Sequence, residues 1–242
     1  MPADSRLVQN GIVRAGRFRI VWTATVFTAL CGRLPAQSTR AADLATGKVL
    51  VMQQNSADPN FAESVILLIH YDKDGVLGLR LNQPSAVPLS RLKDLQGARN
   101  RPDRVYVGGP VELETVTALV RSPNAPPDAM HVAPDLYAVQ TLRGIEAALN
   151  ETKNENGLRV YLGYSGWVMP QLQNEVNFGS WFIFEHGERY VFDREPRTLW
   201  KRLLDRTGAQ FAFAPAARRH GFVTLSAQPT SASTDRFHLD IE

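Results

Sequence analysis

The hydrophobic positions of the chain fall into short runs that turn residues separate. The run at residues 64–70 is almost continuously apolar and rich in branched side chains, which is typical of a strand buried on both faces. A loop at 71–75 ends in Gly and leads to a second apolar run at 76–81, so these two runs predict an antiparallel hairpin. A shorter run at 48–53 predicts another strand beside them.

The rest of the pattern predicts more strands than helices. Further strands are expected at 105–107, 114–120, 130–139 and 158–162, with a hairpin formed by 181–184 and 190–192. Helical spacing of apolar residues predicts helices at 141–150, 171–177 and 198–206, the last one ending at Gly208. Because short turns join several of the strands, we expect an α+β fold with a mixed, mainly antiparallel sheet.

Charge is unevenly distributed along the 242 residues. The whole chain has 27 basic and 24 acidic residues, a formal net charge of +3. Residues 1–46 hold six Arg and two Asp, so the remaining chain has 21 basic and 22 acidic residues and a net charge of −1. A nearly neutral body lacks the positive field that draws proteins to nucleic acid, which argues against nucleic acid as the partner.

The first 46 residues have the parts of a secretory signal. Three Arg precede a short apolar run at 20–31, and Leu34 and Ala36 occupy the −3 and −1 positions of a cleavage site after Ala36. We therefore expect export to the periplasm or cell envelope, with a cytoplasmic protein as the alternative. The apolar run is short for a transmembrane helix, and no transmembrane span is expected in the mature body.

Composition also suggests how the chain is divided. Residues 1–46 are expected to form a targeting-like segment, residues 47–210 a single domain, and residues 211–242 a partly flexible C-terminal extension rich in Ser, Thr and Ala. The single Cys31 excludes an intramolecular disulfide framework and a cysteine-based zinc cluster.

Three motifs stand out for their Gly, Pro and aromatic residues. The first runs from the turn at 58–61 through His70 to Asn82 and Pro84, the second is residues 108–111, and the third spans residues 161–181. The third has the densest unusual composition in the chain, and we interpret it as a Gly-rich and aromatic turn between a strand and a short helix.

In order and spacing, these motifs resemble the signatures of the bacterial YqgE/AlgH family over about residues 45–208. The resemblance implies a single α+β domain in which a small β-barrel or a bifurcated sheet is flanked by helices. It implies no known reaction. Members are often labelled transcriptional regulators, and they are generally cytosolic, so the N-terminal segment departs from the family pattern.

Four positions depart from the usual signatures. The family usually has Arg where this chain has Gln83, an apolar residue at Arg80, Gly at Pro170 and Glu at Gln173. We expect these changes to remove one basic and one acidic group from the candidate site.

The candidate binding residues come from all three motifs. They are Asp58, Asn60, His70, Asn82, Gly109, Tyr164, Trp167, Gln171 and Glu175. Each also has a structural interpretation: Asp58 and Asn60 suit turn capping, and His70 has no second His at ligand spacing. The aromatic residues are equally compatible with a binding face and with core anchors.

The sequence contains none of the common catalytic motifs that were considered. HExxH, GxSxG, GxxxxGK[ST], GxGxxG and CxxC patterns are all missing, and Ser165 lies in GYSGW with no identifiable base. We therefore assign no catalytic residue, no metal site and no cofactor. The leading hypothesis is a non-enzymatic binding or regulatory protein whose partner is an unknown small molecule or protein.

Two alternatives remain at this point. One is a hydrolase that uses Asp58, His70 and Glu175. The other is a DNA-binding transcriptional regulator, for which Arg197, Lys201, Arg202 and Arg206 on the expected helix at 198–206 and the basic residues at 218–220 would be the contacts.

Overall fold

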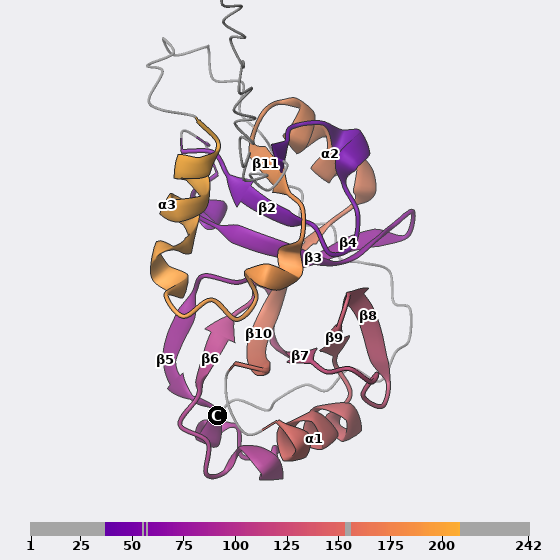
Figure 1. Ribbon diagram of the computed structural model, residues 1–242, viewed down its shortest axis with the longest axis vertical. Coiled ribbons are helices and arrows are strands. Elements are labelled where there is room, and N and C mark those ends of the chain that lie inside the picture. Colours follow the sequence, from indigo (N-terminus) through magenta and orange to yellow (C-terminus); the bar gives the residue numbers. More distant parts are fainter. Residues whose placement is uncertain (1–36, 55, 57, 153–155, 209–242) are drawn as a thin grey trace, which may run out of the picture. The chain divides into compact units, whose positions relative to one another are not determined.

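The computed structural model describes residues 37–208 except 55, 57 and 153–155 (Figure 1). The targeting-like segment up to Ala36, Cys31, the basic residues at 218–220 and the extension at 211–242 lie outside the described residues. Among the described residues, no helix combines the length and apolarity that a membrane crossing needs.

In the described residues, eleven strands form one branched sheet whose two halves share strand β10. Half-sheet A consists of β1 (Gln37–Ser38), β11 (Trp181–Phe184), β2 (Val49–Met52), β3 (Val65–Asp72), β4 (Gly75–Arg80) and the C-terminal part of β10 (Leu158–Trp167). Half-sheet B consists of β5 (Pro84–Pro88), β6 (Arg104–Val107), the N-terminal part of β10, β7 (Val111–Arg121), β9 (Leu136–Val139) and β8 (Ala129–Ala133).

The sheet is mixed and mainly antiparallel. Only the β10–β6 pair is parallel among the strand pairs of the described residues. The sheet does not close into a barrel, because it divides at β10 and ends at the edge strands β1, β5 and β8. The predicted α+β class is therefore confirmed, in its bifurcated form.

Three α-helices and five short 3-10 helices accompany the sheet in the described residues (Figure 1). The α-helices are α1 (Leu142–Glu151), α2 (Met169–Asn177) and α3 (Pro196–Arg206). The 3-10 helices are Ala41–Asp43, Pro59–Phe61, Leu89–Arg91, Gln96–Ala98 and Gly187–Arg189. The side chain of Thr141 caps α1 by accepting the backbone N–H of Gly144 at 3.1 Å.

Alternating side chains of the strands feed separate apolar clusters. In β2, Val49 and Val51 join the cluster that lies between the half-sheets and under α3, whereas Leu50 and Met52 join the cluster under α2. Because successive side chains of a strand point to opposite faces, a four-residue apolar run can serve two cores. A third cluster lies between half-sheet B and α1, where Ile145 is fully buried.

Three expectations about local structure are wrong. Residues 161–167 do not form a turn: β10 continues through them, with an irregularity near Gly163, and joins half-sheet B to half-sheet A. Residues 190–192 are not a strand, since a 3-10 helix and turns follow β11. The edge strand β5 was missed because a Pro lies at each of its ends, and Pro usually marks a break in the ladder.

Glycine residues allow β10 to pair with strands of both half-sheets. The backbone N–H of Gly108 donates to Leu162 O at 2.8 Å, and its carbonyl accepts the N–H of Arg80 at 2.8 Å, so this residue connects β10 to β4 where they separate. A Cβ on Gly109 would lie 2.2 Å from the Tyr164 carbonyl, and Gly163 has a φ of +68°. The buried Ser165 hydroxyl also donates to Gly108 O at 3.3 Å. Backbone thus packs on backbone at this crossing, which leaves no room for side chains.

We expect Gly109→Ala to lower the free energy of unfolding by about 2–3 kcal/mol, because the new methyl group would overlap the backbone of Tyr164. Urea unfolding monitored by tryptophan fluorescence measures this change. The matched control is Gly75→Ala in β4, where the nearest atom to an added Cβ is 4.0 Å away and the change should stay within about 0.5 kcal/mol. Equal stability of the two variants would contradict the close packing described for this crossing.

Candidate functional site

The first motif holds the start of β3 against the end of β4. Asp58 Oδ1 accepts the backbone N–H of Asn60 at 2.9 Å and so caps the 3-10 helix Pro59–Phe61. Asn82 Oδ1 accepts the N–H of Val65 at 3.0 Å, and its Nδ2 donates to Glu63 O at 2.8 Å. Asp58, Asn60 and Asn82 therefore act in local backbone structure.

Two of the departures from the family signature lie in contact. The Arg80 guanidinium donates through Nη1 to Gln83 Oε1 and through Nη2 to Asn60 O at 2.5 Å, and it lies 5.7 Å from the centre of the Phe61 ring. Burial lowers the pKa of Arg80, and the Asp58 carboxylate offsets part of this effect. Arg80 thus supplies a basic group beside the position where Gln83 lacks one.

The third motif builds a buried aromatic cluster around one carboxylate. Glu175 Oε2 accepts the indole N–H of Trp167 at 3.2 Å and that of Trp181 at 2.9 Å, while Gln171 Nε2 donates to Oε1 at 3.1 Å. Phe61 stacks on Trp167 with ring centres 5.5 Å apart, and the two indoles meet edge to face at 6.2 Å. We call Phe61, Trp167, Gln171, Glu175 and Trp181 the indole–carboxylate cluster; it ties α2 to β10 and β11.

The remaining candidates are engaged or buried elsewhere. His70 Nε2 lies 3.0 Å from Asp72 Oδ2, and hydrogen bonds from the backbone of Asp74 help to lower the pKa of that carboxyl. Tyr164, whose side chain is 1% exposed, donates its hydroxyl to Glu112 Oε1 at 3.0 Å, and Gly109 packs on its backbone.

The three residues of the hydrolase set, Asp58, His70 and Glu175, have separate partners. In the described residues, no hydrogen bond or ion pair connects any two of Asp58, His70 and Glu175. The described part of the chain contains no group of three or more His, Cys, Asp or Glu side chains placed to hold a metal ion. What the first and third motifs form is a set of structural contacts.

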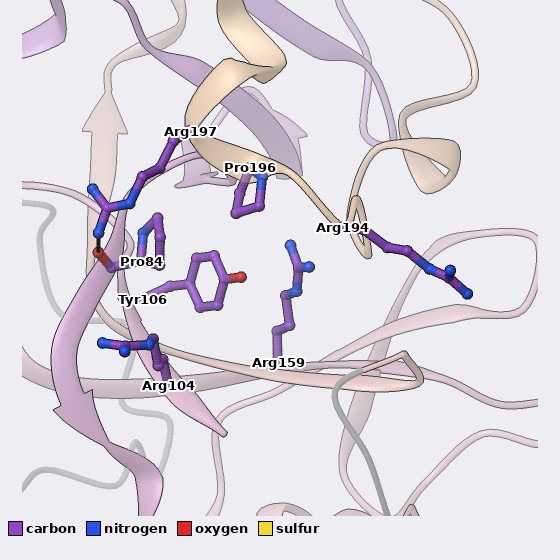
Figure 2. Close-up of a pocket in the computed structure, with 7 residues that line it drawn as sticks. All are labelled: Pro84, Arg104, Tyr106, Arg159, Arg194, Pro196 and Arg197. Carbon is purple, nitrogen blue, oxygen red and sulfur yellow. Dashed lines mark hydrogen bonds between the residues drawn. The ribbon is translucent and has the colours of Figure 1, made fainter. Parts of the chain in front are cut away.

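A pocket that the motifs did not indicate lies between half-sheet B and α3 (Figure 2). Its volume is about 350 Å³, and its lining residues are Pro84, Arg104, Tyr106, Arg159, Arg194, Pro196 and Arg197. Four of these seven residues are arginines, and none is acidic. We refer to it as the arginine pocket.

Arg159 is the buried member of the arginine pocket. It comes from β10, is 4% exposed and points up beside the Tyr106 ring, with 4.7 Å from its Cζ to the ring centre (Figure 2). Its Nη1 donates to Val191 O at 2.7 Å and its Nη2 to Asp193 O at 2.5 Å. The two carbonyl dipoles and the aromatic faces of Tyr106 and Phe192 stabilise its charge.

Two buried polar atoms beneath the arginine pocket lack hydrogen-bond partners among the described residues. They are Arg159 Nε and the hydroxyl of Tyr161. Burial raises the pKa of the Tyr161 phenol far above its ordinary value, and the positive charge of Arg159 offsets part of that rise. The phenol therefore stays neutral, and among the described lining residues of the arginine pocket the buried charge is that of Arg159.

The other three arginines surround the mouth of the arginine pocket and are exposed. Arg197 Nη2 donates to Pro84 O at 3.3 Å and Arg104 Nη1 to Ser85 O at 3.3 Å, while Arg104 and Arg194 extend outward on opposite sides in Figure 2. Within the described part of the chain, no carboxylate forms an ion pair with any of the four.

The acidic residues beside the pocket arginines in the sequence have other partners. Asp103, which precedes Arg104, accepts from Arg101 Nε at 2.7 Å. The Asp193 carboxylate lies 2.6 Å from Arg202 Nη2 and accepts the Glu195 N–H at 2.8 Å. Glu195 Oε2 is 3.5 Å from the Thr198 hydroxyl. The positive end of the α3 dipole, at Pro196 and Arg197, adds to the same field. This arrangement is suited to holding an anion.

Comparison with known proteins identifies the family of this chain. The family model DUF179, described as AlgH-like, matches residues 49–212. The chain belongs to this AlgH-like family. It is 32% identical over 178 residues to UPF0301 protein SCO2948 of Streptomyces coelicolor, covering 69% of this chain and 89% of that protein. It is 31% identical over 179 residues to UPF0301 protein Mmc1_0726 of Magnetococcus marinus, covering 73% and 95%.

Two solved structures share the fold. The solution structure of the AlgH protein from Pseudomonas aeruginosa matches with a TM-score of 0.56 and 23% identity, covering 72% of this chain and 95% of that one. The crystal structure of protein DIP2367 from Corynebacterium diphtheriae matches with the same TM-score and identity, covering 68% and 87%. The resemblance to the YqgE/AlgH family is thereby confirmed, and none of these names describes an activity.

None of the nine candidate residues lines the arginine pocket, although Pro84 of the first motif does. The binding role of the nine candidate residues stays a prediction, but Tyr164, Trp167 and Trp181 are buried and so do not form an exposed face. Sequence analysis missed Arg159; the available signal was a single Arg inside the otherwise apolar run at 158–162. A charge at such a position requires an unusual environment.

We expect Glu175→Gln to lower the free energy of unfolding by about 1–3 kcal/mol, because a neutral amide oxygen accepts the two indole N–H groups more weakly than a carboxylate does, and the amide N–H₂ would replace the oxygen that accepts from Gln171. Urea unfolding measures the loss, and the tryptophan emission maximum should shift with it. The control is Glu114→Gln on the exposed part of β7. If Glu175→Gln unfolds like its control, the carboxylate does not hold the cluster.

Proposed function

We propose that this protein is a non-enzymatic binding or regulatory protein that takes up a small anionic ligand in the arginine pocket. The observation that carries the proposal is the buried guanidinium of Arg159, which has no carboxylate partner in the described residues. Burying a charge is costly unless an opposite charge or a full set of hydrogen bonds accompanies it. An anionic ligand would provide both.

The surroundings of Arg159 support a ligand rather than an internal partner. Three exposed arginines and the N-terminus of α3 add positive charge around the same opening, and the lining has no acidic residue to balance it. The net charge of residues 47–242 is −1, so this concentration is local and not a general property of the body. A pocket of about 350 Å³ also lies in the usual size range of small-molecule sites.

The two alternatives find less support. A hydrolase would need Asp58, His70 and Glu175 on one substrate, whereas each is held by a separate partner. A duplex DNA site needs a row of accessible cations. On α3, however, Lys201 lies 3.4 Å from Asp205, and Arg202 lies 2.6 Å from Asp193.

We expect citrate, a multivalent anion, to raise the thermal midpoint of the protein above that in sodium chloride of equal ionic strength, because it binds the folded pocket only. The double variant Arg104→Gln, Arg194→Gln should lose most of this increase, since both side chains are exposed and their removal leaves the core intact. Differential scanning fluorimetry at low ionic strength measures both effects.

The matched control is Arg143→Gln, an exposed arginine on α1 outside the pocket lining. It should keep the citrate response of the parent protein. An equal loss in both variants would indicate a general charge effect, and a parent protein that does not respond to citrate would contradict the proposal. Duplex DNA that binds more tightly than citrate would favour the regulator alternative.

We also propose that the protein is exported to the periplasm or cell envelope, with a cytoplasmic protein as the alternative. The support is the sequence pattern alone: three Arg precede a short apolar run at 20–31, and Leu34 and Ala36 occupy the −3 and −1 positions of a cleavage site. We expect N-terminal sequencing of the protein from its host to begin at Gln37. Recovery of the intact chain from Met1 in the cytosolic fraction would overturn this location.

A further inference from the structure

The charges and shape of the arginine pocket indicate which class of anion it binds. This inference rests on the proposed function. Four guanidinium groups line one opening of about 350 Å³, and no acidic side chain lines it. A ligand with a single negative charge would leave most of this positive charge unbalanced. The charge count therefore indicates a ligand with at least two negative charges.

The donors at the base of the pocket suit tetrahedral oxyanions. A guanidinium has five N–H groups, and Arg159 uses two of them on the carbonyls of Val191 and Asp193. Its Nε–H is buried and has no hydrogen-bond partner among the described residues. Guanidinium groups match phosphate oxygens in geometry as well as in charge, and several arginines can share one diphosphate.

Polar surface predominates in the pocket, but Pro84, Pro196 and the Tyr106 ring add an apolar part, which indicates an organic body on the ligand. Pro84 and Pro196 lie near the Tyr106 ring in Figure 2, with Arg104 and Arg197 to one side and Arg159 and Arg194 to the other. Neither proline side chain can donate or accept a hydrogen bond. Inorganic anions would leave this surface without a partner, whereas a ring or chain attached to the anionic group would cover it.

We propose that the ligand is a small organic diphosphate, of the nucleoside diphosphate class. Its phosphates lie between Arg159 and the exposed arginines at the mouth, and its organic body lies against Pro84, Pro196 and Tyr106. Arg104 and Arg194 turn inward from their outward positions to complete the phosphate contacts. This assignment follows from the side chains of the arginine pocket and is independent of the indole–carboxylate cluster.

The test is calorimetric titration of the full chain with ADP, inorganic pyrophosphate, adenosine and succinate in a phosphate-free buffer of low ionic strength. We expect ADP to bind most tightly, pyrophosphate about tenfold more weakly, succinate more weakly still, and adenosine not measurably. The double variant Arg104→Gln, Arg194→Gln should lose about tenfold or more in ADP affinity. Arg143→Gln should retain the parent affinity.

The outcomes separate this inference from the proposed function. If pyrophosphate binds as tightly as ADP, the organic body makes no contact and the assignment to an organic diphosphate is wrong, while anion binding stands. If succinate equals pyrophosphate, the phosphate preference is wrong. If no anion binds, or if the pocket variants bind like Arg143→Gln, both the inference and the proposed function are wrong.

Discussion

The close contact of backbone with backbone where Gly108 and Gly109 meet β10 is the constraint on which the rest of this structure depends. The hydrogen bonds of Gly108 reach Leu162 on one side and Arg80 on the other, so the strand can leave one half-sheet and enter the other without losing its partners. A buried peptide group without a hydrogen-bond partner is costly. At this crossing the turn that contains Gly108 supplies the hydrogen-bond partners that the strands lack. Strand β10 carries both Arg159 of the arginine pocket and Trp167 of the indole–carboxylate cluster, on opposite sides of this crossing.

The spacing of apolar residues in the sequence predicted those strands and helices whose buried positions follow that same spacing. The run at 64–70 is a doubly buried strand, and the helix around Ile145 follows its apolar face. Local patterns failed where long-range contacts override local preference. In the sequence Gly163 indicated a turn. In the structure its positive φ lies within β10, where this strand crosses another backbone segment. Pro84 and Pro88 read as breaks, but they are tolerated because β5 is an edge strand with β6 as its only partner in the described sheet.

The candidate site was less predictable than the fold, for a physical reason. The motifs draw attention to residues with restricted conformations or large rings, and in this protein those residues build turns, crossings and buried clusters. Glu175 illustrates this, since it looks like a free acid in the sequence and proves to be the shared acceptor of two indoles. The arginine pocket gathers residues from four separate segments, and its charge pattern arises only when Arg104, Arg159 and Arg194 are brought together by folding.

The position of β10 in the chain also has a consequence for synthesis. This strand occupies residues 158–167, yet it pairs with β4, β6 and β7, all of which leave the ribosome before it. Until it emerges, each of those earlier strands has an open edge where β10 will lie, and open edges of apolar strands are prone to pair with other chains. The nascent protein therefore depends on its last third to protect its first two thirds.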